Sequence, residues 1–296
     1  MKWILILIIF VSHCAFAQKE HWLHSAGFAV TTVSSDVELK NPDQEKALTF
    51  RPNVASGSGL AIETKYIGLA YLFTGNESQF KEFPRSKYQD IRFNFHLRHF
   101  DFRLNYQHYR GAVVKEGGLS KFYKDYEVKS LNGRIHYYGN SEHLNYVRDG
   151  KKLIERVATN EGFNHSRSWF AGLNLDRRRL TLPENLAPEH LAELTEEDIT
   201  YSRFFQAFSW GPMLGYDYLM QYSSLYFRVK MGAGPAFQSS GEVVEQFEFA
   251  FNWGGAFKKR HLLSLGFDMY VMSFEDDSQI ISNNNAQIAI TYTYAF

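Results

Sequence analysis

The string His165-Ser166-Arg167-Ser168-Trp169 holds the residue types of a nucleophilic site. A serine acts as a nucleophile when a base lies within hydrogen-bond reach and a third group orients that base. Adjacent residues of a strand point to opposite faces, so His165 cannot serve Ser166 if this segment is extended. The string by itself supplies no base for either serine, and we expect the protein not to be an enzyme.

The histidines between residues 96 and 165 do not have the spacing of metal ligands. No His-x-x-x-His pair occurs among them, and lone histidines in polar surroundings usually belong to hydrogen-bond networks. Gly57-Ser58-Gly59 and Gly232-Ala233-Gly234 are not phosphate-binding loops, because no predicted helix follows either of them. We therefore expect no metal site and no cofactor.

Charged residues recur on the polar faces of alternating segments, six positive and six negative. They are Arg92, Arg98, Arg103, Arg134, Arg228 and Lys230 together with Glu63, Asp90, Asp101, Asp217, Glu248 and Asp268. Burying charges is costly unless they are paired, so a balanced set in one interior predicts ion pairs between opposing walls. Such an interior is either packed with salt bridges or a narrow, weakly ion-selective pore. We therefore expect a structural or adhesive role, or a narrow pore for small solutes.

The elements that must position these residues show period-two alternation. In 263–271 and in 285–296, apolar residues occupy every second position. Side chains of a strand point alternately to opposite faces, so each segment predicts a strand with one apolar and one polar face. Paired segments of this kind predict antiparallel hairpins at 60–64 with 67–73, 90–98 with 101–107, and 225–237 with 247–257.

Weaker alternation predicts further strands at 28–38, 131–138, 144–148, 169–175 and 204–218. The chain then has about 12 strands, within a range of roughly 10 to 14. Long polar connectors cover 40–52, 74–87, 114–129 and 178–203, and they alternate with very short ones. In the longest connector, Pro188 to Leu194 predicts a short helix with proline in its first turn.

Two architectures explain such alternation: a soluble β-sandwich and a barrel in an outer membrane. The length of the segments favours the barrel, because crossing a bilayer takes roughly 9 to 11 tilted residues. Tyr and Trp gather near strand ends, as at Tyr66, Trp169 and Trp210, where interfacial girdles require them. Short turns alternating with long loops are also typical of these barrels. We therefore predict the all-β class and a single up-and-down antiparallel transmembrane β-barrel.

The C-terminal strand places Ile290, Tyr292, Tyr294 and Phe296 on one face. This ending resembles the signal by which outer-membrane barrels are recognised for assembly, which implies the barrel-assembly machinery and outer-membrane lipids as partners. With both termini in the periplasm, residues 258–261 form a periplasmic turn. The segments 178–203 and 274–284 are then external loops.

The first seventeen residues predict a secretory signal peptide. Lys2 precedes an apolar run over 3–11, and Ala15-Phe16-Ala17 predicts cleavage after Ala17. A membrane anchor is the alternative, but the run has about half of the roughly 20 residues that a spanning helix needs. Residues 18–296 then form one exported barrel domain in the outer membrane. Because the single cysteine, Cys14, lies in the leader, the mature chain has neither disulfides nor thiol chemistry.

The overall composition excludes two further classes. With 32 Lys and Arg against 32 Asp and Glu, the chain lacks the basic excess of a nucleic-acid-binding protein. An aromatic content of 17% is too high for a disordered chain.

Several short motifs occur in an order that resembles a known family. They are Arg51-Pro52-Asn53, Gly57-x-Gly59, Lys65-Tyr66-Ile67-Gly68-Leu69, Tyr106-Gln107-x-Tyr109-Arg110-Gly111 and Gly215-Tyr216-x-Tyr218. Together they resemble the Gram-negative envelope family called domain of unknown function 4421, over roughly residues 49–296. The resemblance implies an outer-membrane barrel without a known activity. In 144–168 the chain lacks the Gln-rich, Ser-Ala-Gly segment that this family tends to carry.

A second resemblance concerns the serine string alone. Ser166-Arg167-Ser168-Trp169 is similar to a string in the outer-membrane phospholipase, where an Asn that orients the catalytic His follows the Trp. Here Phe170 follows, and the upstream His-x-Ser pair of that family does not occur. A lipid hydrolase of the phospholipase type is therefore the alternative function. A serine and a histidine in contact on the lipid-facing wall at the outer rim would favour it.

Overall fold

The structure is a computed structural model that describes residues 23–40, 47–54, 56–75, 78–116, 119–159, 162–186, 204–276 and 279–296. The predicted signal peptide and the predicted helix at Pro188 to Leu194 lie outside the described residues.

Thirteen strands and two helices follow one another along the described chain. The first strands are β1 (Leu23–Lys40), β2 (Ala47–Phe50), β3 (Ser56–Thr64), β4 (Ile67–Thr74), β5 (Lys87–Leu97), β6 (Phe100–Glu116) and β7 (Leu119–Tyr138). The helices α2 (Ser141–Arg148) and α3 (Gly150–Thr159) come next. They are followed by β8 (Phe163–Thr181), β9 (Phe204–Tyr222), β10 (Leu225–Gln238), β11 (Val243–Phe257), β12 (His261–Asp276) and β13 (Gln279–Ala295).

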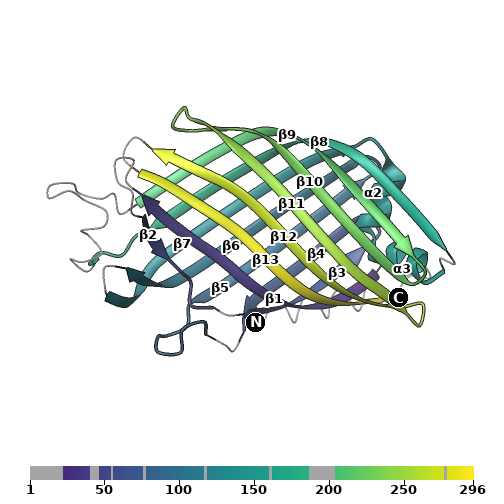
Figure 1. The fold of residues 1–296 in the computed structure, drawn as a ribbon, viewed down its shortest axis with the longest axis horizontal. Coiled ribbons are helices and arrows are strands. Elements are labelled where there is room, and N and C mark those ends of the chain that lie inside the picture. The colour runs from purple at the N-terminus through teal and green to yellow at the C-terminus, as the bar shows by residue number, and fades with distance from the viewer. Residues whose placement is uncertain are drawn as a thin grey trace.

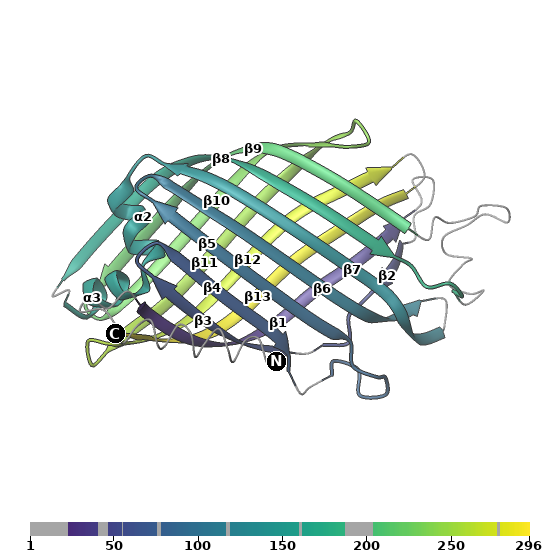
Figure 2. The ribbon, with the colours of Figure 1, turned by 180° about the vertical axis from the view of Figure 1, so that it is seen from behind.

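All strands except the short β2 form the wall of a closed barrel (Figures 1 and 2). Each wall strand pairs antiparallel with its neighbour in the chain, and β13 pairs with β1 from Ser25–Ala295 to Lys40–Ile280, which closes the sheet. The wall therefore has twelve strands in up-and-down order, and the predicted fold class is confirmed. The three predicted hairpins are also present, as β3–β4, β5–β6 and β10–β11.

Alternation along the strands gives the wall two chemically different faces. In β8, Phe170, Asn174 and Arg178 are buried inside, whereas Trp169 and Leu175 are exposed outside. Every wall strand exposes large apolar side chains in this way. A water-soluble protein would bury such a band, whereas lipid covers it in an outer-membrane barrel. The fold and its outer surface are those of an outer-membrane β-barrel.

The two ends of the barrel differ. At one end, which we call the turn end, the strands are joined by the turns 65–66, 98–99, 223–224 and 258–260. The C-terminus and both helices lie at this end (Figure 1). The opposite end, the loop end, carries the connections 75–86 and 182–203 as well as the short ones 117–118 and 277–278. Short turns are typical of the periplasmic side of outer-membrane barrels, and the placement of residues 258–261 in the periplasm stays a prediction.

The helical hairpin α2–α3 covers the turn end of the lumen. Helix α2 contacts β8, and α3 contacts β1, β11 and β13 on the other side of the opening. The side chains of Leu144 in α2 and of Ile154 and Val157 in α3 are fully buried. The prediction of a strand at 144–148 is wrong, because the Asn140 side chain accepts hydrogen bonds from two backbone N–H groups and starts a helix there.

At the loop end, two strand pairs run further than the sequence predicts. The connector expected at 114–129 is mostly strand, because β6 and β7 stay paired to Glu116 and Leu119. A register shift at Gly111, which has a φ of 87°, lets the pairing resume beyond Arg110. Likewise, β12 and β13 extend through most of the loop expected at 274–284.

An aromatic core fills the lumen near the loop end. The rings of Phe50 and Tyr126 stack at 4.8 Å, and those of Tyr88 and Tyr109 at 4.7 Å. Strand β2 brings Phe50 into this core by pairing with the outer part of β1. The polar part of the interior is therefore confined between the aromatic core and the helical hairpin.

Candidate functional site: the charged interior

Glu248 of β11 lies at the centre of a buried charge cluster. Its Oε1 lies 2.8 Å from Nζ of Lys230, 3.0 Å from Nη1 of Arg134 and 3.7 Å from Nη1 of Arg103. Lys230 Nζ also lies 3.2 Å from Nδ1 of His136. Three cations around one carboxylate leave this cluster with an excess of positive charge.

Two fully buried aspartates hold further arginines beside this cluster. Asp101 accepts hydrogen bonds from Nε of Arg103 at 2.9 Å and from Nη2 of Arg148 at 2.8 Å. Asp217 accepts one from Nε of Arg228 at 2.9 Å. Carboxylates can be buried at this depth because each is paired with a guanidinium.

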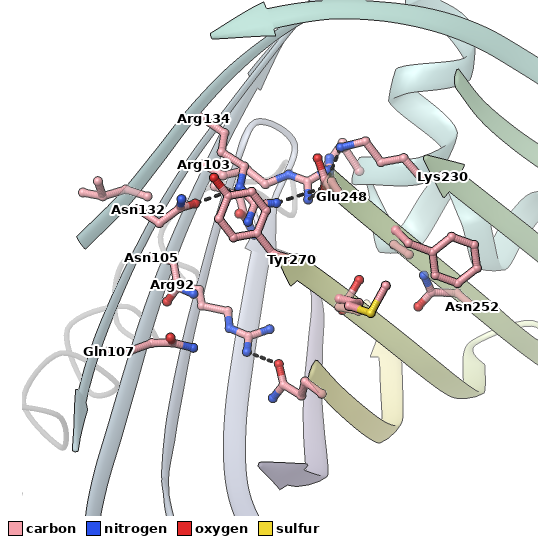
Figure 3. A pocket seen from close by; sticks show the side chains of 18 of the residues that line it. Arg92, Arg103, Asn105, Gln107, Asn132, Arg134, Lys230, Glu248, Asn252 and Tyr270 are labelled. Carbon is pink, nitrogen blue, oxygen red and sulfur yellow. Dashed lines mark hydrogen bonds and ion pairs between the residues drawn. The ribbon is translucent and has the colours of Figure 1, made fainter. Parts of the chain in front are cut away.

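A third carboxylate lies closer to the loop end. Asp90 is fully buried and accepts hydrogen bonds from Nη2 of Arg92 at 2.7 Å and from the hydroxyl of Tyr88 at 2.9 Å. The guanidinium of Arg92 reaches across the lumen to the side chain of Gln287 on β13 (Figure 3).

These side chains surround a cavity of about 260 Å³ (Figure 3). Its lining contains six cations but only two carboxylates, whereas the other aspartates are buried beneath the surface. The cations are Arg92, Arg103, Arg134, Arg148, Arg228 and Lys230, and the carboxylates are Glu248 and Asp268. The surface that a solute meets is therefore cationic, although the charges of the interior as a whole nearly balance.

Several polar atoms of this lining have spare hydrogen-bonding capacity. Among the described residues, no acceptor meets Nη2 of Arg103 or Nε of Arg148, and no donor meets Oε2 of Glu248. Unmet polar groups around a cavity are costly unless water or a solute satisfies them. The cavity is therefore chemically suited to a polar guest.

The twelve residues predicted to form the interior network divide into three groups. Nine take part in the pairs described above: Arg92, Arg103, Arg134, Arg228, Lys230, Asp90, Asp101, Asp217 and Glu248. Asp268 lines the cavity with an exposed side chain. Arg98 and Glu63 lie elsewhere.

The positions of Arg98 and Glu63 follow from the turns beside them. Arg98 occupies the β5–β6 turn with a φ of 51° and is exposed, so it is not part of the network. Glu63 lies below the helical hairpin, where it accepts hydrogen bonds from Ser25 Oγ at 2.8 Å and from the backbone N–H of Gly150 at 3.1 Å. It anchors α3 rather than lining the cavity.

Further polar contacts fix the hairpin to the wall. Asp149, between the helices, lies 3.0 Å from Nδ1 of His24 on β1. Tyr146 donates to Glu142 at 2.8 Å, and its ring lies 3.9 Å from the guanidinium carbon of Arg156. Partial burial and the bond to Glu142 raise the pKa of the Tyr146 hydroxyl.

Sequence reasoning missed the contribution of α2 to the interior. Arg148 and His143 both come from this helix, and they reach Asp101 and Asp217 respectively. The available signal was Asn140, a preferred N-cap residue, with Glu142 in the first turn. The network also contains His136, which alternation alone did not single out.

The serine string lies on β8 near the helices. Ser166 contacts a histidine, but that residue is His143, not His165, at 3.0 Å from Oγ to Nδ1. Ser168 is buried and accepts a hydrogen bond from the backbone N–H of Asn140. The contact lies on the inner wall at the turn end. It therefore does not meet the lipid-facing, outer-rim condition of the phospholipase alternative.

The residues of the predicted assembly signal share the outer face of β13. Ile290, Tyr292 and Phe296 are exposed, and the ring of Tyr294 packs edge-on against Phe296 at 5.2 Å.

Within the described ranges, no group of three or more His, Cys, Asp or Glu side chains could hold a metal ion. The described helices are too short or too polar to cross a membrane.

Comparisons place solved outer-membrane proteins beside this chain. It is similar to the β-domain of the Bordetella autotransporter BrkA, with 9% identity, a TM-score of 0.42, and coverage of 92% of this chain and 100% of that one. It is also similar to an outer-membrane channel from Pseudomonas putida F1, with 9% identity, a TM-score of 0.39, and coverage of 93% of this chain and 96% of that one. The outer-membrane protease OmpT from Escherichia coli is similar with 7% identity, a TM-score of 0.37, and coverage of 93% of this chain and 97% of that one. No family model and no curated protein match the chain, so the resemblance to domain of unknown function 4421 stays a prediction.

Proposed function

We propose that the protein is an outer-membrane barrel that admits small anionic solutes to a cationic cavity, with its periplasmic end closed by α2–α3. One observation supports this most strongly: six cations and two carboxylates line the cavity, while Asp90, Asp101 and Asp217 are buried behind it. The proposal narrows the predicted small-solute pore to one sign of charge.

Electrostatics explains why this arrangement favours anions. A narrow lumen with walls of low dielectric constant focuses the field of its lining charges and raises the local concentration of counter-ions. Pores that conduct anions or phosphate commonly carry rings of Arg and Lys. Arginine also offers paired N–H donors to carboxylate and phosphate oxygens.

The helical hairpin makes this a closed state. Arg148 at the end of α2 belongs both to the hairpin and to the cavity lining, through its bond to Asp101. Displacing the hairpin would open the turn end and would at the same time remove Arg148 from the cavity lining. We therefore expect the full chain to conduct rarely, and more often when the hairpin is loosened.

Recordings in planar lipid bilayers across a KCl gradient test this function. We expect small conductance steps whose reversal potential has the sign of anion preference. Arg134→Gln should shift that potential towards zero, since Glu248 keeps Lys230 and Arg103 as partners. The matched control is Arg98→Gln, which removes the same charge from an exposed turn outside the cavity.

One variant tests the closed state. Asp149→Ala removes the contact with His24 and should raise the open probability. Cation preference in the wild-type protein would overturn the proposal. So would the absence of steps from both the wild type and Asp149→Ala, and a structural or adhesive role would then be the better explanation.

We also propose two partners. The exposed apolar band supports contact with outer-membrane lipids. The aromatic outer face of β13 supports recognition of this strand by the barrel-assembly machinery. Phe296→Ala should lower the yield of folded barrel in cells more than the exposed Val243→Ala, and equal yields would contradict this role.

A further inference from the structure

Three side chains at the turn end form a chain of contacts, of which only Asp217 also belongs to the charge network of the proposed anion cavity. Ser166 Oγ lies 3.0 Å from Nδ1 of His143, and Nε2 of His143 lies 3.4 Å from Oδ1 of Asp217. We propose that Ser166, His143 and Asp217 form a serine hydrolase site for small acyl esters reached from the periplasm.

Separate elements hold these groups together. Ser166 is on β8, and Asp217 on β9 lies opposite Ser168 in the β8–β9 register. His143 is in the first turn of α2, where the Asn140 side chain accepts from its backbone N–H at 3.1 Å. Asn140 also donates through its own backbone N–H to Ser168 at 2.9 Å. The start of the helix is therefore fixed to the strand that carries Ser166.

The surroundings of His143 suit a base. Its side chain is fully buried. Nδ1 contacts Ser166, whereas Nε2 makes no hydrogen bond among the described residues and faces Asp217 at 3.4 Å. With the ring proton on Nε2 towards Asp217, the Nδ1 lone pair accepts the hydroxyl proton of Ser166. Arg228 and the Tyr138 hydroxyl also contact Asp217 and hold its carboxylate in place. The 3.4 Å separation from Asp217 is long for a hydrogen bond and is expected to shorten when His143 becomes doubly protonated.

Ser166 is reachable, whereas Ser168 is not. Ser166 is half-buried and lines a second cavity of about 210 Å³. This cavity also contains Asn140, Glu142, Arg156, His165 and Arg167. In contrast, Ser168 is buried, and its hydroxyl donates to the carbonyl of Trp169 at 2.8 Å. The geometry therefore distinguishes one serine of the string from the other.

The second cavity indicates the substrate class. It lies at the turn end and is lined by polar and charged side chains, so its substrate enters from water. Arg156 and Arg167 give it positive charge, while Glu142 is occupied by the hydroxyl of Tyr146. A volume of about 210 Å³ admits a short acyl group but not a diacyl lipid. Short esters with a polar or anionic group fit it best.

The reaction has two steps, and both balance without a cofactor. In the first, Ser166 Oγ bonds to the acyl carbon while its proton passes to Nδ1 of His143, and the ester C–O bond breaks as that proton goes to the leaving oxygen. In the second, water attacks the acyl-serine, His143 takes a proton from the water, and the carboxylic acid leaves as Ser166 regains its proton. The guanidinium group of Arg156, which lines the same cavity, can stabilise charge on the carbonyl oxygen.

A fluorophosphonate probe tests the site in the full chain refolded in detergent. We expect one adduct, located on Ser166 by mass spectrometry, and turnover of p-nitrophenyl acetate. Ser166→Ala should abolish both, and His143→Gln should slow adduct formation by about 100-fold or more, the usual contribution of a general base. Asp217 is a positioning residue, so Asp217→Glu should keep more of the labelling rate than Asp217→Asn.

Ser240→Ala is the matched control, since it removes an exposed hydroxyl from the β10–β11 turn at the opposite end of the barrel. It should label Ser166 at the wild-type rate. Heat-dependent gel mobility will show that each variant is a folded barrel before its rate is compared. No adduct on Ser166 of the folded wild type would overturn the proposal, as would an unchanged rate in folded His143→Gln. Neither result bears on ion conduction, so failure here leaves the anion cavity standing.

Discussion

Replacing Glu248 with glutamine should strongly destabilise the barrel, because it leaves buried cations without their shared carboxylate. Of the three cations, Arg103 keeps Asp101 and Arg134 keeps the side-chain oxygen of Asn132. Lys230 is different, because its side chain is 1% exposed. Its other close polar contact among the described residues is His136.

The magnitude follows from this imbalance. Removing one member of a buried pair typically costs about 3–5 kcal/mol. Since two of the three cations keep partners, and the glutamine oxygen can still accept one bond, we expect about 3 kcal/mol for Glu248→Gln. The double variant Glu248→Gln/Lys230→Met removes the buried cation as well and should recover most of this loss.

Urea unfolding in detergent micelles, followed by tryptophan fluorescence, gives the free energies. Glu245→Gln is the matched control, because this exposed side chain lies on the same strand; it should stay within about 0.5 kcal/mol of the wild type. A similarly small effect of Glu248→Gln would refute the reasoning. A double variant no more stable than the single one would show that Lys230 is not the source of the cost.

Three further substitutions probe the wall and the hairpin. Leu214→Arg places a charge on an outer position that is 69% exposed, and it should cost about 2–4 kcal/mol if that position is near the bilayer midplane; a neutral effect on unfolding in lipid vesicles would argue against lipid contact. Gly172→Ala introduces a Cβ that clashes with the His136 ring and the Ile135 carbonyl, so we expect a loss of about 1–3 kcal/mol in the same assay. Asn140→Ala removes the cap of α2 and should cost about 1 kcal/mol, seen as faster proteolysis between 141 and 159, whereas unchanged cleavage would mean that the cap does not hold the hairpin.

Much of the wall could be predicted from the sequence, because lipid imposes a simple rule on each strand. Between 225 and 257 apolar residues alternate with polar ones, and the observed β10–β11 hairpin follows this pattern. The rule fails where lipid does not contact the chain. Beyond Arg110 the strands β6 and β7 continue without an outward apolar row, so the sequence predicts a loop there.

The interior was harder to predict, since it depends on which elements enter it. The five-residue pattern at 144–148 fits a strand and a helix equally. Because the predicted strand is wrong, the contributions of Arg148 and His143 to the interior are not predicted. Arg98 fits the alternation of β5 by parity, but the chain turns there. Equal numbers of charges predict pairing but not its layering, in which Asp90, Asp101 and Asp217 are buried and their arginine partners face the cavity.

All of these proposals depend on the closure of twelve strands into a lipid-embedded barrel. The most direct test is the electrophoretic mobility of the refolded chain in detergent with and without boiling. We predict two different mobilities, because a closed barrel resists the detergent until it is heated. Identical mobilities for boiled and unboiled samples, or a mature chain that stays soluble without detergent, would contradict the account.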